Sequence, residues 1–395
     1  MRPGTARSAV VSLTLRDFRS YERAEVALGA GLTVVSGRNG AGKTNLLEGL
    51  YFGCVGRSCR TANDREVVRF GASLVRVEVH TRDEQGDAHV ISVGFEPGAG
   101  KKLRVDGVAV ERLLDAPARP LVGVFLPDRL ELVKGAPAVR RAHLDQVIAA
   151  LWPARAATRR EYARALAQRN ALLGRVRAGI ASRGSLPAWD AELARHGVAL
   201  MADRRTAVAE LADRFADRGG ELGLDGEVAL RYRPRSSATD AAGLAEELAE
   251  RVDSDLDRGF TGHGPHRDDL VLSRDGRELR TYGSQGQQRL ALLALLLAER
   301  EAVGDARGAL PLMLLDDVMS ELDADRRARL VELLRAGGQS VVTTTDVAHV
   351  PTAEDAEVAK LAVANGSVLQ NASRTTPAPP DSARRDGERV DSGRA

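Results

Sequence analysis

The chain has 395 residues, of which 43% are hydrophobic, 28% charged and 4% aromatic, with a net charge of +2. This composition is typical of a globular protein with more than one domain, and so few aromatic residues argue against recognition of bases mainly by ring stacking. The cysteines, Cys54 and Cys59, exclude a disulfide framework and a four-cysteine zinc site, so we expect buried apolar fillers. The longest apolar run, residues 290–298, is too short to span a membrane, and no signal peptide is visible; we expect a cytoplasmic protein with no membrane partner.

The first third of the chain is predicted to consist of strands around one helix. Short segments rich in β-branched residues, each bounded by Gly, Asp or other polar residues, predict strands at 10–15, 32–36, 74–80, 89–95 and 121–125. A helix is expected at 45–51, directly after the strand at 32–36.

The middle of the chain is predicted to be helical. Residues 140–218 are rich in Ala, Leu and Arg, and their apolar residues recur at helical spacing. Pro153 and the segment 184–187 divide this region into at least three helices. A helix of about 25 residues would be about 37 Å long, which indicates a compact helical arm instead of a long coiled coil.

Strands return in the last third, at 228–232, 269–272, 312–315, 341–344 and 358–363, with a helix at 287–302. The tail after residue 373 is rich in Pro, Ser, Arg and Asp and is expected to be disordered. We therefore divide the chain into an N-terminal lobe (1–129), an inserted helical arm (130–224), a C-terminal lobe (225–370) and a disordered tail (371–395).

The strongest motif is a phosphate-binding loop between the strand at 32–36 and the helix that follows. Its residues satisfy G-x-x-x-x-G-K-[ST] in full: Gly37, Arg38, Asn39, Gly40, Ala41, Gly42, Lys43 and Thr44. Glycines allow backbone N–H groups to surround a phosphate, Lys43 supplies a charge for the β- and γ-phosphate oxygens, and the Thr44 hydroxyl is a ligand for Mg²⁺. The sequence therefore predicts ATP and Mg²⁺ as cofactors.

Two adjacent acids, Asp316 and Asp317, follow the apolar strand at 312–315. A strand of this kind delivers carboxylates to a phosphate site at its C-terminal end. We expect Asp316 to hold Mg²⁺ and Asp317 to orient or deprotonate the attacking water, so that Lys43 and these two acids form the catalytic set. Taken alone, the pair is also compatible with a helix N-cap.

A second anion site is predicted at Ser284, Gln285, Gly286 and Gln287, which precede the apolar helix. A Ser and a Gly at a helix N-terminus can bind an anion, although such a turn can also be a simple helix start with Ser284 as its cap. Because the chain has two phosphate-binding elements and only one lysine-bearing loop, a nucleotide held between two copies of the protein would use both.

The order of these motifs, followed by Ser320-Glu321-Leu322-Asp323, resembles an ATPase of the ATP-binding-cassette type in its SMC-like branch. More closely, the chain resembles the RecF family, on the segments 13–21, 56–61 and 132–137 and above all on 264–269 and 282–289. The resemblance covers residues 8 to 370 and implies an α/β fold: a P-loop ABC-type ATPase head, split in sequence, with an inserted helical domain.

The resemblance also implies a function. Two heads would close head to tail on two ATP molecules, with Ser284 and Gly286 of one copy touching the γ-phosphate held by Lys43 of the other. Such a homodimer would bind gapped duplex DNA or a single-strand/double-strand junction and release it on hydrolysis. It would work with RecO and RecR to load RecA onto single strands. These events would belong to repair, replication, recombination and the SOS response, close to the nucleoid. Thr343-Thr344-Thr345-Asp346 lacks the histidine that transporter ATPases have there, so a slow ATPase is expected.

Other functions are less compatible with the sequence. A transporter nucleotide-binding subunit would have a short gap between Lys43 and Asp316, a nuclease-associated or structural SMC protein would have long heptad arms, and a small-molecule kinase would not need the turn at Ser284. An ABC-type ATPase subunit of another assembly remains the alternative.

Several arginines are candidates for DNA contacts. Residues 151–183 contain eight arginines and one acid, whereas residues 240–258 contain seven acids and two arginines. In the basic segment, Arg155, Arg159, Arg160, Arg164 and Arg169 lie at a spacing that places several on one helix face, and arginines that contact phosphates provide affinity without sequence choice. A solvated helix face is the simpler alternative.

Two further groups leave alternatives open. Arg57 and Arg60, just after the helix at 45–51, could contact ATP phosphate or DNA or could lie in a solvated loop. His263, His266, Asp268 and Asp269 could be drawn as a metal site, but we expect this loop to pack against the turn at Ser284, with Arg267 paired to Asp269.

Overall fold

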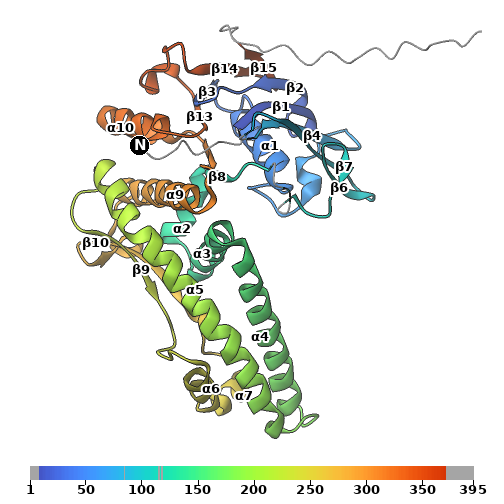
Figure 1. Ribbon diagram of the computed structural model, residues 1–395, viewed down its shortest axis with the longest axis vertical. Helices are drawn as coiled ribbons and strands as arrows, with labels where there is room; N and C mark the ends of the chain where they lie inside the picture. Colours follow the sequence, from blue (N-terminus) through green and yellow to red (C-terminus); the bar gives the residue numbers. More distant parts are fainter. Residues whose placement is uncertain (1–8, 84, 114–115, 117–118, 371–395) are drawn as a thin grey trace, which may run out of the picture.

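The structure is a computed structural model that describes residues 9–83, 85–113, 116 and 119–370. A head of two sheets and their helices stands on a helical arm (Figure 1). The tail predicted at 371–395 lies outside the described residues. Within the part of the chain that is described, no helix combines the length and apolar character needed to cross a membrane.

The first sheet has six strands, five of them parallel, with the order β15-β14-β3-β13-β12-β8. It carries the predicted phosphate loop after β3 and the paired acids after β12, with β13 between those two strands. Its strands are β3 (Leu32–Ser36), β8 (Val122–Phe125), β12 (Leu312–Leu315), β13 (Ser340–Thr344), β14 (Ala359–Ala364) and the antiparallel edge strand β15 (Ser367–Gln370).

The second sheet is antiparallel, with the order β2-β1-β4-β5-β6-β7. Alternate residues of β4 are buried, as expected for a sheet with one face on the core. Its strands are β1 (Ala9–Phe18), β2 (Tyr21–Ala27), β4 (Val75–Arg82), β5 (Ala88–Glu96), β6 (Gly100–Val105) and β7 (Val108–Ala109).

Helix α1 (Lys43–Val55) lies between the two sheets and is buried along nearly its whole length. It approaches the antiparallel sheet closely, because a Cβ at Gly49 would lie 2.7 Å from Leu15 Cδ2 and one at Gly53 would lie 2.4 Å from Val79 Cγ2. Cys54 on this helix is fully buried and Cys59 is half-buried, and burial raises the pKa of both thiols to about 12. The prediction that these cysteines fill apolar space is confirmed.

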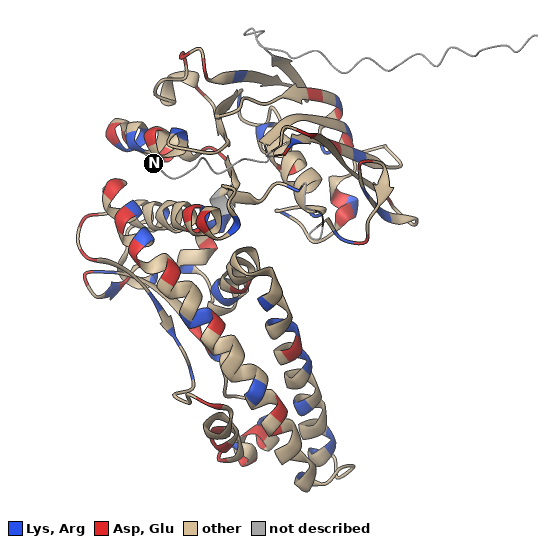
Figure 2. Ribbon diagram, viewed as in Figure 1, with Lys and Arg blue, Asp and Glu red and all other residues tan. Residues whose placement is uncertain are grey.

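The predicted helical region contains three long helices, separated near Pro153 and at 183–185 as expected. They are α3 (Pro137–Leu151), α4 (Ala156–Arg177) and α5 (Leu186–Glu221), preceded by the short α2 (Glu131–Lys134). With 36 residues, α5 is about 54 Å long, well beyond the length expected from the sequence. Figure 2 shows basic and acidic residues interspersed along α5, whereas α4 is mainly basic.

The segment after the arm returns to it. The strands β9 (Val228–Arg233), β10 (Asp269–Arg274) and β11 (Arg277–Glu278) form an antiparallel ribbon. Between β9 and β10 in the chain lie α6 (Ala241–Ala249) and α7 (Val252–Arg258), which pack on α5 and α4. Apolar clusters join these helices at Leu193 and Leu244 and at Leu173 and Val252. Residues 241–258, which the sequence division assigns to the C-terminal lobe, therefore pack with the arm.

The remaining helices connect the arm to the parallel sheet. Helix α9 (Gln285–Arg307) packs against α5 and β8, follows the short α8 (Leu279–Tyr282), and is fully apolar from Leu290 to Ala298. Helix α10 (Ala324–Arg335) lies between β12 and β13 in the chain. Short 3₁₀ turns lie at η1 (Asp64–Val67), η3 (Pro127–Leu130), η4 (Pro153–Arg155), η5 (Arg183–Ser185), η6 (Pro265–Arg267), η7 (Val318–Glu321) and η8 (Val347–His349).

Every strand predicted from the sequence is present, with ends shifted by at most a few residues. The strands that the sequence reasoning missed are β2, β6, β7, β11 and β15, which are short, charged or at a sheet edge. The predicted α/β architecture is confirmed: a head split in sequence, with an inserted helical domain.

Candidate nucleotide-binding site

The phosphate loop occupies the position that the motif requires, between the end of β3 and the start of α1. The Gly37 N–H donates to the Thr344 carbonyl of the neighbouring strand at 3.2 Å, and a Cβ at Gly37 would lie only 2.3 Å from the Val363 carbonyl oxygen. Gly42 has φ of +116°, a conformation that side-chain-bearing residues rarely adopt. These two positions therefore need glycine for the loop to have this shape.

Lys43 is buried beneath the loop and is aimed at it. Its ammonium donates to the Gly37 carbonyl at 2.7 Å and the Arg38 carbonyl at 3.2 Å, and its exposed fraction is 7%. A buried ammonium held only by neutral carbonyls has no ion-pair partner in the described part of the chain. It is therefore available to an anion that occupies the loop.

The antiparallel sheet supports the loop from the other side. The Tyr21 hydroxyl donates to the Gly42 carbonyl at 3.0 Å, and the Ser20 hydroxyl accepts from Asn45 at 3.0 Å. Burial raises the pKa of Tyr21, which keeps its hydroxyl protonated as a donor. Sequence reasoning did not identify these residues, because they lie in a turn and strand far from the motif in the chain.

Asp316 meets Thr44 at the end of the parallel sheet. The Thr44 hydroxyl donates to Asp316 Oδ2 at 2.8 Å, and the Thr343 hydroxyl donates to Asp316 Oδ1 at 2.7 Å. Asp316 is 6% exposed. A threonine hydroxyl beside a buried carboxylate is a donor set that suits Mg²⁺, and it joins the two predicted metal ligands. Sequence reasoning missed Thr343, which lies in a run of three threonines without a distinguishing pattern.

Asp317 follows immediately and has a strained backbone, with φ of +49°. Its N–H donates to the Thr343 hydroxyl at 2.9 Å, whereas its Oδ1 is buried without a hydrogen-bond partner among the described residues. Burial raises the pKa of this carboxyl, although the Ser320 hydrogen bond and the charge of Lys43 act in the opposite direction. An unpartnered carboxylate with a raised pKa is suited to accept a proton from water.

These residues fit a nucleoside triphosphate with its metal ion. The loop offers backbone donors and an unpaired ammonium for phosphate, Thr44 and Asp316 offer oxygen ligands for Mg²⁺, and Asp317 offers a free carboxylate oxygen. The phosphate loop, Lys43, Thr44, Asp316 and Asp317 are thus brought together by the fold.

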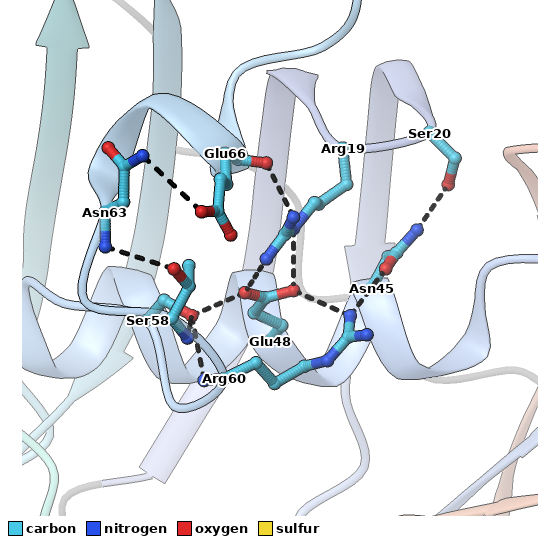
Figure 3. A network of polar contacts seen from close by, with 9 residues as sticks. Arg19, Ser20, Asn45, Glu48, Ser58, Arg60, Asn63 and Glu66 are labelled. Carbon is cyan, nitrogen blue, oxygen red and sulfur yellow. Dashed lines mark hydrogen bonds and ion pairs between the residues drawn. The ribbon is translucent and has the colours of Figure 1, made fainter.

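A buried carboxylate fixes the helix that begins at Lys43 (Figure 3). Glu48 has no exposed surface and accepts from Arg19 at 2.7 and 2.9 Å, from Ser58 at 2.5 Å and from Arg60 at 3.1 Å. Arg60 also donates to Asn45 at 3.2 Å. Arg60 is thus engaged on the surface of α1, whereas Arg57 is exposed.

The second predicted anion site lies at the start of α9. Ser284 is its N-cap: its hydroxyl accepts from the Gln287 N–H at 3.3 Å, and the Gln287 side chain accepts from the Ser284 N–H at 2.9 Å. Ser284, Gln285 and Gly286 are exposed. In the described parts of the chain, none of these residues forms a hydrogen bond with the phosphate loop of the same chain. Arg289, one turn later, pairs with Glu321 after the paired acids.

The predicted DNA face on α4 is partly neutralised. Arg155 pairs with Asp203 at 3.3 Å and stacks on Trp152, and Arg159 pairs with Asp145 at 3.3 Å. Arg160 and Arg164 are exposed and form no ion pair with the residues that the structure describes.

Arg169, which the spacing places with this group, does not belong to a surface. It is fully buried and donates to Asp190 at 2.6 Å, Asp255 at 2.7 Å and Thr261 at 2.8 Å. The assignment of Arg169 to a DNA face is therefore wrong: its charge is used to join α4, α5 and α7.

The loop at 261–269 also differs from the expectation. Asp269 pairs with Arg140 at 2.7 and 3.0 Å, so the predicted pairing with Arg267 is wrong. His266 packs on the arm, where its Nδ1 accepts from Tyr162 at 2.7 Å, and not against the turn at Ser284. Among the described residues, no group of three or more His, Cys, Asp and Glu side chains is placed to hold a metal ion.

Comparison with known proteins places this geometry in context. The AAA domain family matches residues 12–139. A curated relative, the DNA replication and repair protein RecF of Anaeromyxobacter sp. (strain Fw109-5), is 40% identical over 374 residues, which cover 91% of this chain and 98% of the relative.

Solved structures give the same result. The recombination mediator protein RecF with ATP, described as part of the RecFOR pathway, superposes with a TM-score of 0.82 at 25% identity and covers 94% of this chain and 100% of its own. An Smc head bound to the C-terminal winged-helix domain of ScpA has a TM-score of 0.56 at 17% identity over 91% of this chain and 96% of its own, a likeness of fold alone.

Proposed function

Because the chain belongs to the RecF family, we propose that it is a DNA replication and repair protein that binds DNA as an ATP-dependent homodimer and hydrolyses ATP to release it. The relatives cover nearly all of the chain, so the proposal concerns the whole protein. One observation supports it: the phosphate loop with Lys43 and the capped turn at Ser284 are both formed, and no hydrogen bond joins them within the described part of one chain.

The residues of the first half have separate roles in this proposal. Lys43 would hold the β- and γ-phosphates, since its ammonium is buried and has no carboxylate partner among the residues described. Thr44 and Asp316 would hold Mg²⁺, which neutralises charge on the phosphates when bound. Asp317 would orient and deprotonate the attacking water through its unpartnered Oδ1.

The second half would come from another copy. Ser284, Gln285 and Gly286 are exposed at the N-terminus of a 23-residue helix, where free backbone N–H groups and the helix dipole favour an anion. The Gln287 cap fixes the turn without occupying it. Ser284 and Gly286 of one copy would therefore contact the γ-phosphate held by Lys43 of the other, so that dimerisation requires ATP.

The family resemblance extends the proposal to partners. Gapped duplex DNA and single-strand/double-strand junctions would be the DNA substrates, and RecO and RecR would act with this protein to load RecA on single strands. Hydrolysis would be slow, since the segment 343–346 lacks the histidine that transporter ATPases have at this place. We place this activity in the cytoplasm, at the nucleoid.

Binding to a labelled gapped duplex tests this function. Fluorescence anisotropy would be followed with ATP, with ADP and without nucleotide, at one fixed salt concentration, because phosphate contacts make affinity depend strongly on salt. Tight binding with ATP alone is expected. Equal binding in all three states would reduce the nucleotide to a structural ligand, and no binding in any state would favour an ATPase subunit of another assembly.

A further inference from the structure

A hollow of about 420 Å³ opens on the arm, between the end of α7 and the loops that flank β9 and β10. Its lining is unusual for this protein because three of the five residues are arginines: Arg235, Arg258, Phe260, Gly262 and Arg267. The hollow is open to solvent, and its volume is comparable with the space that a small organic ligand such as a single nucleotide occupies.

The three guanidinium groups have no carboxylate partner among the described residues. Arg235, Arg258 and Arg267 are exposed, and the side chain of none of them forms an ion pair or a hydrogen bond within the described ranges. In contrast, Arg155, Arg159 and Arg169 on α4 are all paired with carboxylates. Three arginines of the arm without an ion pair among the described residues therefore line one hollow, whereas others, such as Arg160 and Arg164, lie on the surface of α4.

Two buried acids beside the hollow, Asp255 and Asp268, are engaged in other contacts. Asp255 is buried and bonded to Arg169 and to the Gly262 N–H, at 2.7 and 2.9 Å. Asp268 is buried and accepts from Tyr232, Arg204 and the backbone N–H of Arg235.

An aromatic ring completes the hollow. Phe260 is 42% exposed, and the Arg267 guanidinium lies 5.4 Å from the centre of its ring. An arginine plane beside an exposed aromatic ring is a surface on which an unpaired base stacks. The bases of a duplex are already stacked on one another and would leave this ring without a partner.

Hydrogen bonds hold the loop that lines the hollow to α4. The Thr261 N–H and hydroxyl both donate to Asn170 on α4, at 2.8 and 2.7 Å, and the Thr261 carbonyl accepts from His266 Nε2 at 2.8 Å. Burial lowers the pKa of His266 to about 4, so the His266 ring is neutral at pH 7 and adds no positive charge beside the three arginines. The loop that carries Phe260 and Arg267 is thus fixed to α4, which reduces the ordering cost of binding.

We propose that this hollow binds a nucleotide of single-stranded DNA, with phosphate held by Arg258 and Arg267 and the base against Phe260. Arg235 would contact the adjacent phosphate. Gly262 leaves room for the Arg258 guanidinium, because a Cβ there would lie 3.1 Å from Arg258 Nη1. The inference rests on the proposed function, to which it adds a site for the unpaired strand of a gap or junction.

The test compares paired variants of the full-length protein. Arg258→Gln combined with Arg267→Gln removes two of the unpaired charges, and Arg104→Gln combined with Arg205→Gln removes two exposed charges outside the hollow as the matched control. Phe260→Ala removes the ring, with Phe70→Ala, at a fully exposed phenylalanine on the head, as its control. All these side chains are exposed, so thermal unfolding should not change.

The probes are a labelled oligothymidylate of about 16 nucleotides, the upper site size of one single-strand binding module, and a blunt duplex of the same length. With ATP present, we expect Arg258→Gln/Arg267→Gln and Phe260→Ala each to weaken oligothymidylate binding roughly 5- to 100-fold, since stacking and phosphate contacts are of that strength. The salt dependence of the double variant should fall by about 1.4 in slope, about 0.7 for each lost contact on a single strand. Duplex binding and both control variants should match the unaltered protein.

Three results would overturn the site. The first is unchanged oligothymidylate binding by the variants, and the second is an equal loss of binding to the duplex. The third is competition by an oligoglutamate peptide that displaces oligothymidylate from the unaltered protein and does not bind Arg258→Gln/Arg267→Gln. This third result would assign the hollow to an acidic protein segment. Gapped DNA separates this failure from failure of the function. ATP-dependent binding to the gapped duplex by every variant alike would reject the hollow and leave the proposed function standing, whereas absence of binding by the unaltered protein would reject both.

Discussion

Replacing Glu48 with Gln tests how the arrangement of the nucleotide site is maintained. Glu48 lies on α1, five residues after Lys43, and its buried carboxylate accepts four hydrogen bonds, two of them from Arg19 (Figure 3). Gln has the same shape but no charge, and its NH₂ group would face guanidinium donors instead of accepting from them. Arg19 and Arg60 would then lose their ion pair while remaining in place.

The expected cost follows from the burial of each partner. Removal of one member of a fully buried ion pair costs about 3–5 kcal/mol. Here Glu48 is fully buried, but the side chains of Arg19 and Arg60 are 20% and 38% exposed, so water compensates part of the loss. We therefore expect Glu48→Gln to destabilise the head by about 2–3 kcal/mol, which lowers its Tm by roughly 4–12 °C.

Thermal unfolding of Glu48→Gln, Arg19→Gln and Arg60→Gln, with and without ATP, is the assay. The loss of stability should be largest for Glu48, intermediate for the bidentate Arg19 and within about 1 kcal/mol for the half-exposed Arg60. ATP affinity should fall with Glu48→Gln, because Lys43 and Thr44 begin the same helix. If Arg60→Gln abolished ATP binding without lowering the Tm, Arg60 would be a phosphate contact and the structural explanation would be refuted.

Three other predictions follow from the site and the arm. Lys43→Arg should abolish most ATP hydrolysis while retaining some ATP binding, measured by phosphate release and equilibrium binding, because a guanidinium cannot reproduce a compact ammonium beneath the loop; normal turnover would contradict this role. Asp317→Asn should stop hydrolysis but allow ATP-dependent DNA binding, so a stable ATP-bound complex should accumulate; unchanged phosphate release would exclude Asp317 as the base. The pKa of His266 is about 4 in the folded arm and about 6.5 in an unfolded chain, so the unfolded state binds a proton that the folded state does not, and stability should fall as pH decreases from about 6.5 to 4. His266→Gln should reduce this pH dependence in urea unfolding, and an identical slope would show that other groups cause it.

The sequence predicted most of the head because its signals are local. A buried strand, a glycine-rich turn and a helix follow one another within residues 32–55, and the apolar strand before Asp316 needs no long-range information. The parallel order of β3, β13 and β12 then brings Thr44 and Asp316 together, as the motif spacing implies.

The residues that the sequence did not predict depend on partners distant in the chain. Thr343 becomes important only because β13 lies between β3 and β12, which places its hydroxyl against Asp316. Arg169 has the spacing of a surface arginine, but Asp190 and Asp255, 21 and 86 residues away, enclose it. Helical spacing identifies which residues share a face, and it does not reveal whether another element covers that face.

The same reasoning explains the arm. Helices α6 and α7 are rich in acids, a composition that indicates a solvated segment, yet Leu244, Leu248 and Val252 attach them to α4 and α5. Asp255 of this acidic segment neutralises Arg169 inside the arm. The charge asymmetry that suggests a DNA-binding face is therefore partly internal pairing, and only charges that remain unpaired can serve a polyanion.

Sedimentation velocity of the unaltered protein and of Ser284→Arg, each with ATP and with ADP, tests the central claim most directly. The claim is that ATP held by Lys43 of one copy is completed by Ser284 of the other. The unaltered protein should form dimers with ATP alone, whereas Ser284→Arg should remain monomeric with ATP, at a cost in stability of only about 1 kcal/mol for the lost helix cap. Dimers of Ser284→Arg that form with ATP as readily as those of the unaltered protein would contradict the shared site.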